Sequence, residues 1–344
     1  MSLSAIEWTD ATHNTVTGCD PISPGCEHCY AALMSRRLKA MGVKKYRNEF
    51  EVTLHPEVIC EPLKWKKPRN IFLNSMSDSF NKSVPFEFID QNFAMMLLAD
   101  HHFFFVLTKR IDRAAEYLST KDSPLDDSRR DIVVEIAQHQ GGVIWDSRGN
   151  DPANYVLVPR HGDVSKRRVL PKWPLPNVII GTSIENQRAA DLRREHLRAV
   201  SDLGWKTFVS YEPALGPVDW DGWEFIDWMV CGGESGPNSR PMHTDWARSA
   251  RDFCETNAIP FFFKQVGEWK VIYHRDLEDP DWRDVPTPNP TSKGPRERWL
   301  NIVGGHGFHN ERVVLVRKVP KREAGRLLDG CEWNEMPPGA IPTD

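Results

Sequence analysis

Three cysteines stand close together near the start of the chain, at Cys19, Cys26 and Cys29, with the spacing C-x6-C-x2-C. Three thiolates in one loop can bind three irons of a [4Fe–4S] cluster and leave the fourth iron open to a small-molecule chelator. Glycines and prolines between the cysteines let the loop fold round a bulky group. A helical pattern over 31–41 follows, and its first amides would stabilise thiolate charge. The spacing therefore predicts an iron–sulfur site.

Two other readings of these cysteines stay open. A structural zinc site needs four ligands, and His28 or His13 is available as the fourth. In the second alternative the three cysteines are ordinary free thiols, although buried thiols are usually scattered along a chain. The loop lies at the start of a strand–helix pattern, and this position favours the iron–sulfur cluster.

Short apolar runs recur along the chain, and helical patterns over 85–99, 187–203 and 244–257 separate some of them. Continuous apolar runs of four to six residues are typical of strands buried on both faces. The alternation predicts an α/β fold, a complete or partial (β/α) barrel (TIM barrel) of about six to eight mostly parallel strands with two inserted excursions. The predicted strands are 70–73, 102–107, 177–181, 205–209, 226–231 and 259–263, with one more near the N-terminus.

Polar residues directly follow several of these runs, at the carboxyl end of the sheet where such folds build their sites. Hydroxyls there are suited to a ribose, and a carboxylate after two glycines is suited to an ammonium group. Alternatively, the same residues cap helices or form a tight turn. The residues predicted to bind a cofactor are Ser75, Ser77, Asp78, Ser183, Glu185, Gly232, Gly233 and Glu234.

Three charged residues at strand ends are predicted to be catalytic: Lys109, Glu212 and Lys264. Lys109 is suited to a carboxylate or phosphate. Lys264 follows three phenylalanines and is costly to bury unpaired, so we expect an ion pair with Glu212 or Glu234, or a role at the substrate. A plain structural ion pair is the alternative.

Composition narrows the class of protein. The 344 residues carry a net charge of −4, which argues against coating nucleic acid by bulk charge. No run of eighteen apolar residues is present and no signal peptide is evident, so we expect a cytoplasmic protein without membrane contact. We expect a single barrel domain over 1–344, with an insertion or lid at 119–172 and a C-terminal extension at 270–344 that packs on the barrel.

Many short motifs resemble the phage Gp37/Gp68 family, a domain of unknown function. They include IEWTDAT (6–12), TGC (17–19), SPGC (23–26), CYA (29–31), TLHP (53–56), NSMSD (74–78), LTKR (107–110), EP (212–213), GGESG (232–236), RPMH (240–243), FFFKQ (261–265) and GRLLDG (325–330). The cysteine loop is similar to that of radical S-adenosylmethionine enzymes, with wider spacing than their C-x3-C-x2-C. Those enzymes also hold the amino group of S-adenosylmethionine with a Gly-Gly-Glu segment.

The resemblance implies an enzyme in which the cluster passes an electron to S-adenosylmethionine. The substrate would be a nucleobase or nucleic acid, because of the phage context and the basic runs 64–69 and 165–168. It also implies an electron donor and a three-Cys-motif partner protein. The alternatives are a zinc-stabilised, non-catalytic protein that binds nucleic acid or a partner, and a cluster protein that only transfers electrons or senses oxidation.

Overall fold

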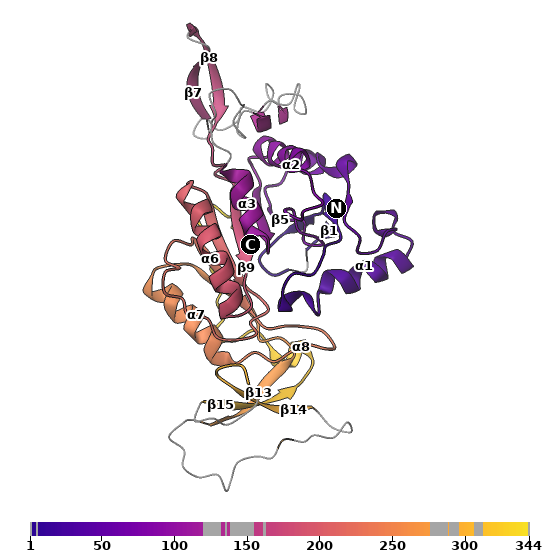
Figure 1. Cartoon of the computed structure of the whole chain (residues 1–344), viewed down its shortest axis with the longest axis vertical. Coiled ribbons are helices and arrows are strands. Elements are labelled where there is room, and N and C mark those ends of the chain that lie inside the picture. Colours follow the sequence, from indigo (N-terminus) through magenta and orange to yellow (C-terminus); the bar gives the residue numbers. More distant parts are fainter. Residues whose placement is uncertain are drawn as a thin grey trace.

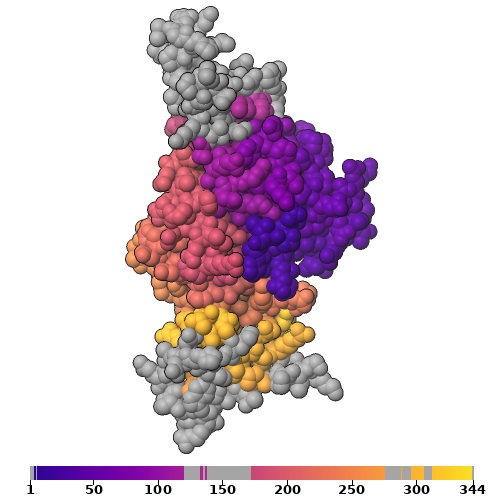
Figure 2. Space-filling model, in the orientation of Figure 1, coloured from indigo at the N-terminus to yellow at the C-terminus, as the bar shows by residue number. Residues whose placement is uncertain are grey.

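The computed structural model describes residues 2–4, 6–119, 132–134, 136–137, 155–160, 163–275, 288, 296–305 and 312–342. Figure 1 shows helices along the outside of a curved sheet, with a small sheet at the lower end. Figure 2 shows the indigo N-terminal residues packed against the middle of the chain and some of the yellow residues at the lower end, while Figure 1 places the C-terminus itself in the middle.

The main sheet has eight strands in the order β1-β2-β5-β6-β9-β10-β11-β12. Its first strand, β1 (Ser2–Leu3), is antiparallel to its neighbour. The other seven are parallel and curl into a half-barrel, which confirms the predicted α/β partial barrel. These are β2 (Ala11–His13), β5 (Asn70–Leu73), β6 (Phe103–Thr108), β9 (Val178–Ser183), β10 (Lys206–Tyr211), β11 (Trp228–Gly232) and β12 (Phe261–Gln265).

Helices cover the outer face of this sheet. These are α2 (Phe86–Leu98), α3 (Ile111–Leu118), α6 (Gln187–Asp202) and α7 (Thr244–Thr256). Helix α1 (Tyr30–Ala40) follows the cysteine loop, and its Ala31 packs against Tyr46 and Met76 instead. Single 3-10 turns are η1 (Pro24–Cys26), η2 (Lys44–Tyr46), η3 (Pro56–Val58) and η4 (Glu61–Lys64). No helix within the described ranges has both the length and the apolar character needed to cross a bilayer.

Smaller elements surround the half-barrel. Helix α8 (Lys321–Ala324) is followed by Gly325, whose φ of +78° interrupts the helical path. The remaining sheets are β3 (Val16–Thr17) with β4 (Thr53–Leu54), β7 (Tyr155–Arg160) with β8 (Asp163–Pro171), and β13 (Trp269–Arg275), β15 (Val313–Lys318) and β14 (Glu297–Asn301) in that order. Most of 119–154 lies outside the described residues, so the predicted lid stays a prediction.

The concave face of the half-barrel is filled with aromatic side chains. Trp8, Phe105, Phe208 and Trp228 are at most 3% exposed, and each ring lies within 6.5 Å of the others, centroid to centroid. Such burial of aromatic surface is a large stabilising contribution. The interior of the curled sheet is therefore a packed core and not a channel.

The C-terminal tail closes the amino ends of the strands. Asn70, at the start of β5, exchanges two hydrogen bonds of 2.8 and 2.9 Å with the backbone of Ile341. Glu335 accepts one bond from the indole of Trp228 through its carbonyl and one from the amide of Phe261 through its carboxylate, both 2.8 Å. The tail therefore covers the starts of β5, β11 and β12.

Candidate functional site

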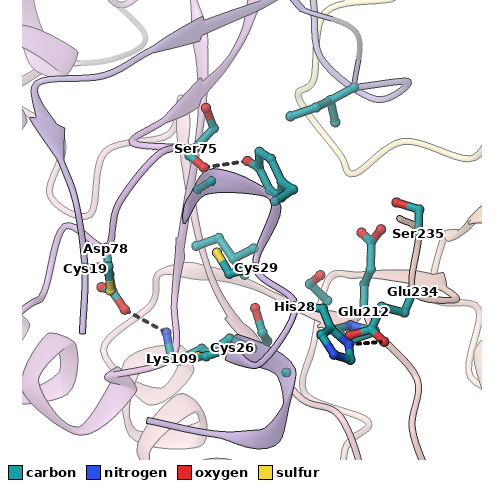
Figure 3. A pocket seen from close by; sticks show the side chains of 18 of the residues that line it. Cys19, Cys26, His28, Cys29, Ser75, Asp78, Lys109, Glu212, Glu234 and Ser235 are labelled. Atoms are coloured by element: carbon teal, nitrogen blue, oxygen red, sulfur yellow. Dashed lines mark hydrogen bonds and ion pairs between the residues drawn. The ribbon is translucent and has the colours of Figure 1, made fainter. Parts of the chain in front are cut away.

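A cavity of about 420 Å³ lies at the carboxyl ends of the parallel strands. Its volume is in the range that accommodates a small molecule or cofactor. The three loop cysteines line it together with residues from the strand ends (Figure 3). Predicted site residues on its wall are Cys19, Cys26, Cys29, Ser75, Ser77, Asp78, Lys109, Ser183, Glu212, Gly233, Glu234 and Lys264. Two predicted residues, Glu185 and Gly232, lie outside this lining.

Two glycines shape the cysteine loop. Gly18 has a φ of +83°, and a Cβ there would lie 2.2 Å from the carbonyl oxygen of Glu51. Gly25 is pressed against Glu185, whose carboxylate would meet an added Cβ at 2.5 Å. A larger residue at Gly18 would force the backbone to move, and one at Gly25 would displace the Glu185 side chain. The loop therefore takes its path because the chain has no side chain at these two points.

Glu185 is an anchor for this loop. It is completely buried and accepts hydrogen bonds from Ser23 of the loop at 2.6 Å, from Arg193 at 3.1 Å and from Lys109. Burial acts to raise the pKa of Glu185, but the charges of Lys109 and Arg193 outweigh it and leave this pKa below the ordinary value. All of its interactions are within the protein, so the predicted contact of Glu185 with a cofactor stays a prediction.

Glu234 of the Gly-Gly-Glu segment forms a second anchor. It accepts two bonds of 2.8 and 2.9 Å and one of 2.5 Å from the amide and guanidinium of Arg240, and it lies 3.1 Å from His28. Arg240 in turn donates to Glu27 and to the carbonyl of Pro24. Burial acts to raise the pKa of Glu234, but the bonds from Arg240 and His28 lower it overall. This carboxylate is ionised while it faces the cavity.

Gly233 permits a close approach of two backbone segments. A Cβ on this residue would lie 2.0 Å from the carbonyl oxygen of Val266. Gly233 therefore lets the ends of β11 and β12 come together beside the cavity.

Asp78 organises the end of the neighbouring strand. It accepts bonds from the hydroxyl of Thr108 at 2.7 Å, from the amide of Lys109 at 3.1 Å and from the guanidinium of Arg110 at 3.0 Å. Its neighbours are also held in place: Ser77 donates to Val16, and the Ser75 carbonyl accepts a bond from Tyr30. Asp78 is therefore a brace between β5 and β6 at the cavity wall.

The sulfur of Cys19 faces a cation and an amide. Arg110 Nη1 lies 3.4 Å and Asn81 Nδ2 3.9 Å from Cys19 Sγ. Burial and the charge of Asp78 raise the pKa of the Cys19 thiol, while Arg110 and Asn81 oppose that rise. Cys29 directly precedes the first residue of α1, where helix amides favour negative charge. These surroundings fit an anionic cluster whose binding displaces the thiol protons.

No set of three His, Cys, Asp or Glu side chains among the described residues is placed to hold a single metal ion. A zinc ion needs its four ligands at about 2.0–2.3 Å, and so in one compact group. A cubane spreads its thiolates round four irons. Cys19, Cys26 and Cys29 line one cavity without forming such a compact group.

Lys264 and Glu212 form the predicted ion pair at the strand ends. Lys264 Nζ lies 2.7 Å from Glu212 Oε1, and both side chains are about one-fifth exposed. The interaction predicted between Lys264 and one of two glutamates is therefore confirmed for Glu212. Because both side chains line the cavity, the pair is accessible to a bound molecule.

Ser210 and Trp8 are among the cavity residues that the sequence did not predict for the site. Ser210 pairs in register with Ser183 on the adjacent strand, and neither hydroxyl has a hydrogen-bonding partner among the described residues. Trp8 forms part of the cavity wall, and its indole N–H is buried without a partner in that same part of the chain. Ser210 directly follows an apolar run, which is the signal that identified Ser183. Nothing in the sequence places Trp8 inside the barrel.

The family model for "Protein of unknown function (DUF5131)" matches residues 3–337. The chain belongs to this family. DUF5131 is the phage Gp37/Gp68 family, so the family resemblance read from the motifs is confirmed. No curated protein matches the chain.

Among solved structures, the chain is similar to a spore photoproduct lyase complexed with dinucleoside spore photoproduct. The two share 11% sequence identity with a TM-score of 0.36, and the match covers 90% of this chain and 68% of the other.

Proposed function

We propose that this protein is an iron–sulfur enzyme of the radical S-adenosylmethionine type. The observation that carries the proposal is the arrangement of one cavity, which is lined by all three loop cysteines and by the polar ends of the parallel strands. The opposite end of the half-barrel is sealed by the C-terminal tail, so this cavity is where a ligand would be shielded from water.

Cys19, Cys26 and Cys29 would hold the cluster, and the open iron would bind S-adenosylmethionine. A reduced cluster at this place supplies the electron for reductive cleavage of S-adenosylmethionine. Glu234 is an ionised acceptor on the cavity wall, suited to the ammonium group of that cofactor.

Ser183 and Ser210 present two neighbouring hydroxyls that suit a ribose. The Lys264–Glu212 pair offers one donor and one acceptor to orient a substrate. The family's phage context and the basic runs favour a nucleobase or nucleic acid. Trp8 and Phe72 on the cavity wall add apolar aromatic surface on which a base can pack. This chemistry needs an electron donor, and a three-Cys-motif partner protein remains part of the proposal.

The test is anaerobic purification of the wild type beside Cys26→Ala and Cys60→Ala. Cys60 is a partly buried free thiol outside the cavity lining and serves as the matched control. We expect about four irons per chain and absorbance near about 400 nm in the wild type and in Cys60→Ala, both largely lost in Cys26→Ala. Enzymatic activity is tested by reducing the protein chemically, adding S-adenosylmethionine and measuring the release of deoxyadenosine.

Other outcomes would redirect the proposal. Colourless protein with one zinc per chain would support a zinc-stabilised binding protein. Iron without deoxyadenosine release would support a protein that transfers electrons or senses oxidation. Equal iron loss in Cys26→Ala and Cys60→Ala would show that iron binding does not depend specifically on the cavity cysteines.

A further inference from the structure

Apolar side chains are exposed on and around α1, directly beside the cysteine loop. Six of the eleven large hydrophobic side chains that are exposed in the described part of the chain lie within 22–43. They are 37–76% exposed, and they are Ile22, Tyr30, Leu33, Met34, Met41 and Val43. Apolar side chains gathered in this way on a protein surface mark an interaction site.

The outer face of α1 is the centre of this surface. Residues at helical spacing form one exposed stripe, here called the α1 stripe, which consists of Tyr30, Leu33, Met34, Arg37 and Met41. The opposite face of the helix carries the small buried residues Ala31 and Ser35. The helix therefore turns its small side chains inward and its large apolar ones toward solvent, the reverse of the usual pattern for a surface helix.

The α1 stripe begins at the mouth of the larger cavity. Tyr30 directly follows Cys29, and both Tyr30 and Ile22 line that cavity. A helix of eleven residues is about 16 Å long. A molecule that lies along the stripe is therefore close to the cysteine loop.

Cations without partners accompany the stripe. Three exposed side chains on α1 and beside η2 form no ion pair or hydrogen bond with another described residue, and they are Arg37, Lys44 and Arg47. Two more cations, Arg36 and Lys39, share the single carboxylate of Glu49. The acids of the cysteine loop, Asp20 and Glu27, already bond to other side chains of the protein. A molecule that covers the stripe is therefore expected to be acidic.

The sequence around the stripe has the same sign. Residues 30–51 contain six basic and two acidic residues, which gives +4 in a chain whose net charge is −4. The positive charge is thus a local property of this segment and not of the whole chain.

We propose that the α1 stripe docks a small acidic protein that carries one electron to the cysteine loop. This rests on the proposed function, which needs an electron donor. In the transfer, one electron leaves the reduced carrier and enters the cluster, and no bond forms or breaks. A carrier seated on the stripe is placed beside the three cysteines.

Two other occupants fit these residues less well. Exposed Met and Tyr beside Arg are typical of protein interfaces, whereas single-stranded nucleic acid stacks on several aromatic rings in a basic groove. Tyr30 is the single aromatic residue of the stripe. A second copy of this chain would bring the same positive charge against itself.

The experiment is isothermal titration calorimetry of the anaerobically purified protein with two acidic carriers, a flavodoxin and a [2Fe–2S] ferredoxin. We expect at least one to bind at about 50 mM salt and to bind more weakly at about 300 mM, because salt screens the charges at the rim of an interface.

Two variants test the stripe. Leu33→Glu places a charge among its apolar side chains, and Arg37→Glu reverses its cation; both residues lie outside the cavity lining. We expect the Kd to rise about tenfold in each. Leu192→Glu and Lys67→Glu make matched changes at exposed positions and should stay within about twofold. Leu192 lies on α6, which Figure 1 shows on the other side of the molecule from α1, and Lys67 precedes β5.

The same preparations separate this proposal from the proposed function. Iron content and deoxyadenosine release with a chemical reductant should be unchanged in all four variants. Release driven by the reduced carrier should fall only in Leu33→Glu and Arg37→Glu. Wild type without iron would overturn the proposed function and the docking proposal with it. Iron-loaded wild type that binds neither carrier would overturn the docking proposal alone, as would equal weakening in Leu33→Glu and Leu192→Glu.

Two further outcomes would overturn the proposal in favour of another occupant. Binding of a short single-stranded oligonucleotide that is lost in Leu33→Glu and Arg37→Glu, without carrier binding, would assign the stripe to nucleic acid. A wild-type dimer in analytical ultracentrifugation that becomes a monomer in Leu33→Glu would assign it to a second copy of the chain.

Discussion

The two ends of the same parallel strands are built from opposite chemistry. At the carboxyl ends, Glu185, Glu234 and Asp78 each bond to a cation beside an open cavity, and the two glutamates also bond to the cysteine loop. At the amino ends, aromatic rings fill the half-barrel, and the C-terminal tail seals it. Apolar packing is therefore concentrated at one end, and polar groups surround a cavity at the other.

The largest effect is expected at the sealed end. Trp228→Ala removes a fully buried ring that packs against Phe105 and Phe208, and it also removes the bond to Glu335. We expect a loss of about 4 kcal/mol in the free energy of unfolding, measured by urea denaturation. Folded variant protein should keep its iron, because the cysteine loop is untouched. Loss of iron at native fold content would contradict the separation of the two ends.

A smaller effect is expected at the open end. Glu185→Gln removes a buried charge and leaves Lys109 and Arg193 without their anion, at a cost of about 3 kcal/mol. The loop anchored through Ser23 should loosen, so protease cleavage within 17–29 should increase. Glu195→Gln, on the exposed face of α6, is the control and should change neither property. A loop equally protected in Glu185→Gln would show that other contacts hold it.

Acid should sharpen the same contrast. The folded-state pKa values of Glu185 and Glu234 lie below the ordinary 4.5, so their stabilisation is present above pH 4.5 and is lost as pH falls below it. Burial lowers the pKa values of His13 and His243 from 6.5 to about 4, so the free energy of unfolding also decreases as the pH is lowered from 6.5 to about 4. In thermal unfolding, Glu185→Gln should flatten only the part below pH 4.5. An unchanged acid slope would exclude Glu185 as a contributor.

The smallest effect tests the seal itself. Asn70→Ala removes both hydrogen bonds to Ile341 and should cost about 2 kcal/mol. Hydrogen exchange of the Ile341 amide should speed up, whereas the cysteine loop should keep its protection. Asn48→Ala removes an exposed bond to Thr53 and should cost less than about 0.5 kcal/mol. If both variants lower the free energy of unfolding equally, the bonds between Asn70 and Ile341 do not hold the tail in place.

Apolar runs predicted the strands because each is buried on both faces, and 70–73 matches β5 in full. The runs ending at 181 and 209 stop two residues short of the ends of β9 and β10, because these strands continue into polar residues near the cavity.

The sequence by itself determined the alternation of strands and helices, the family and the three cysteines, because these depend on local spacing and residue type. Only the tertiary structure decided the partners of the polar residues. Ser23 and Glu185 stand 162 residues apart, and their bond exists because loop and strand end meet at one edge of the sheet. Pairing at such distance depends on how the sheet curls, which no local pattern records.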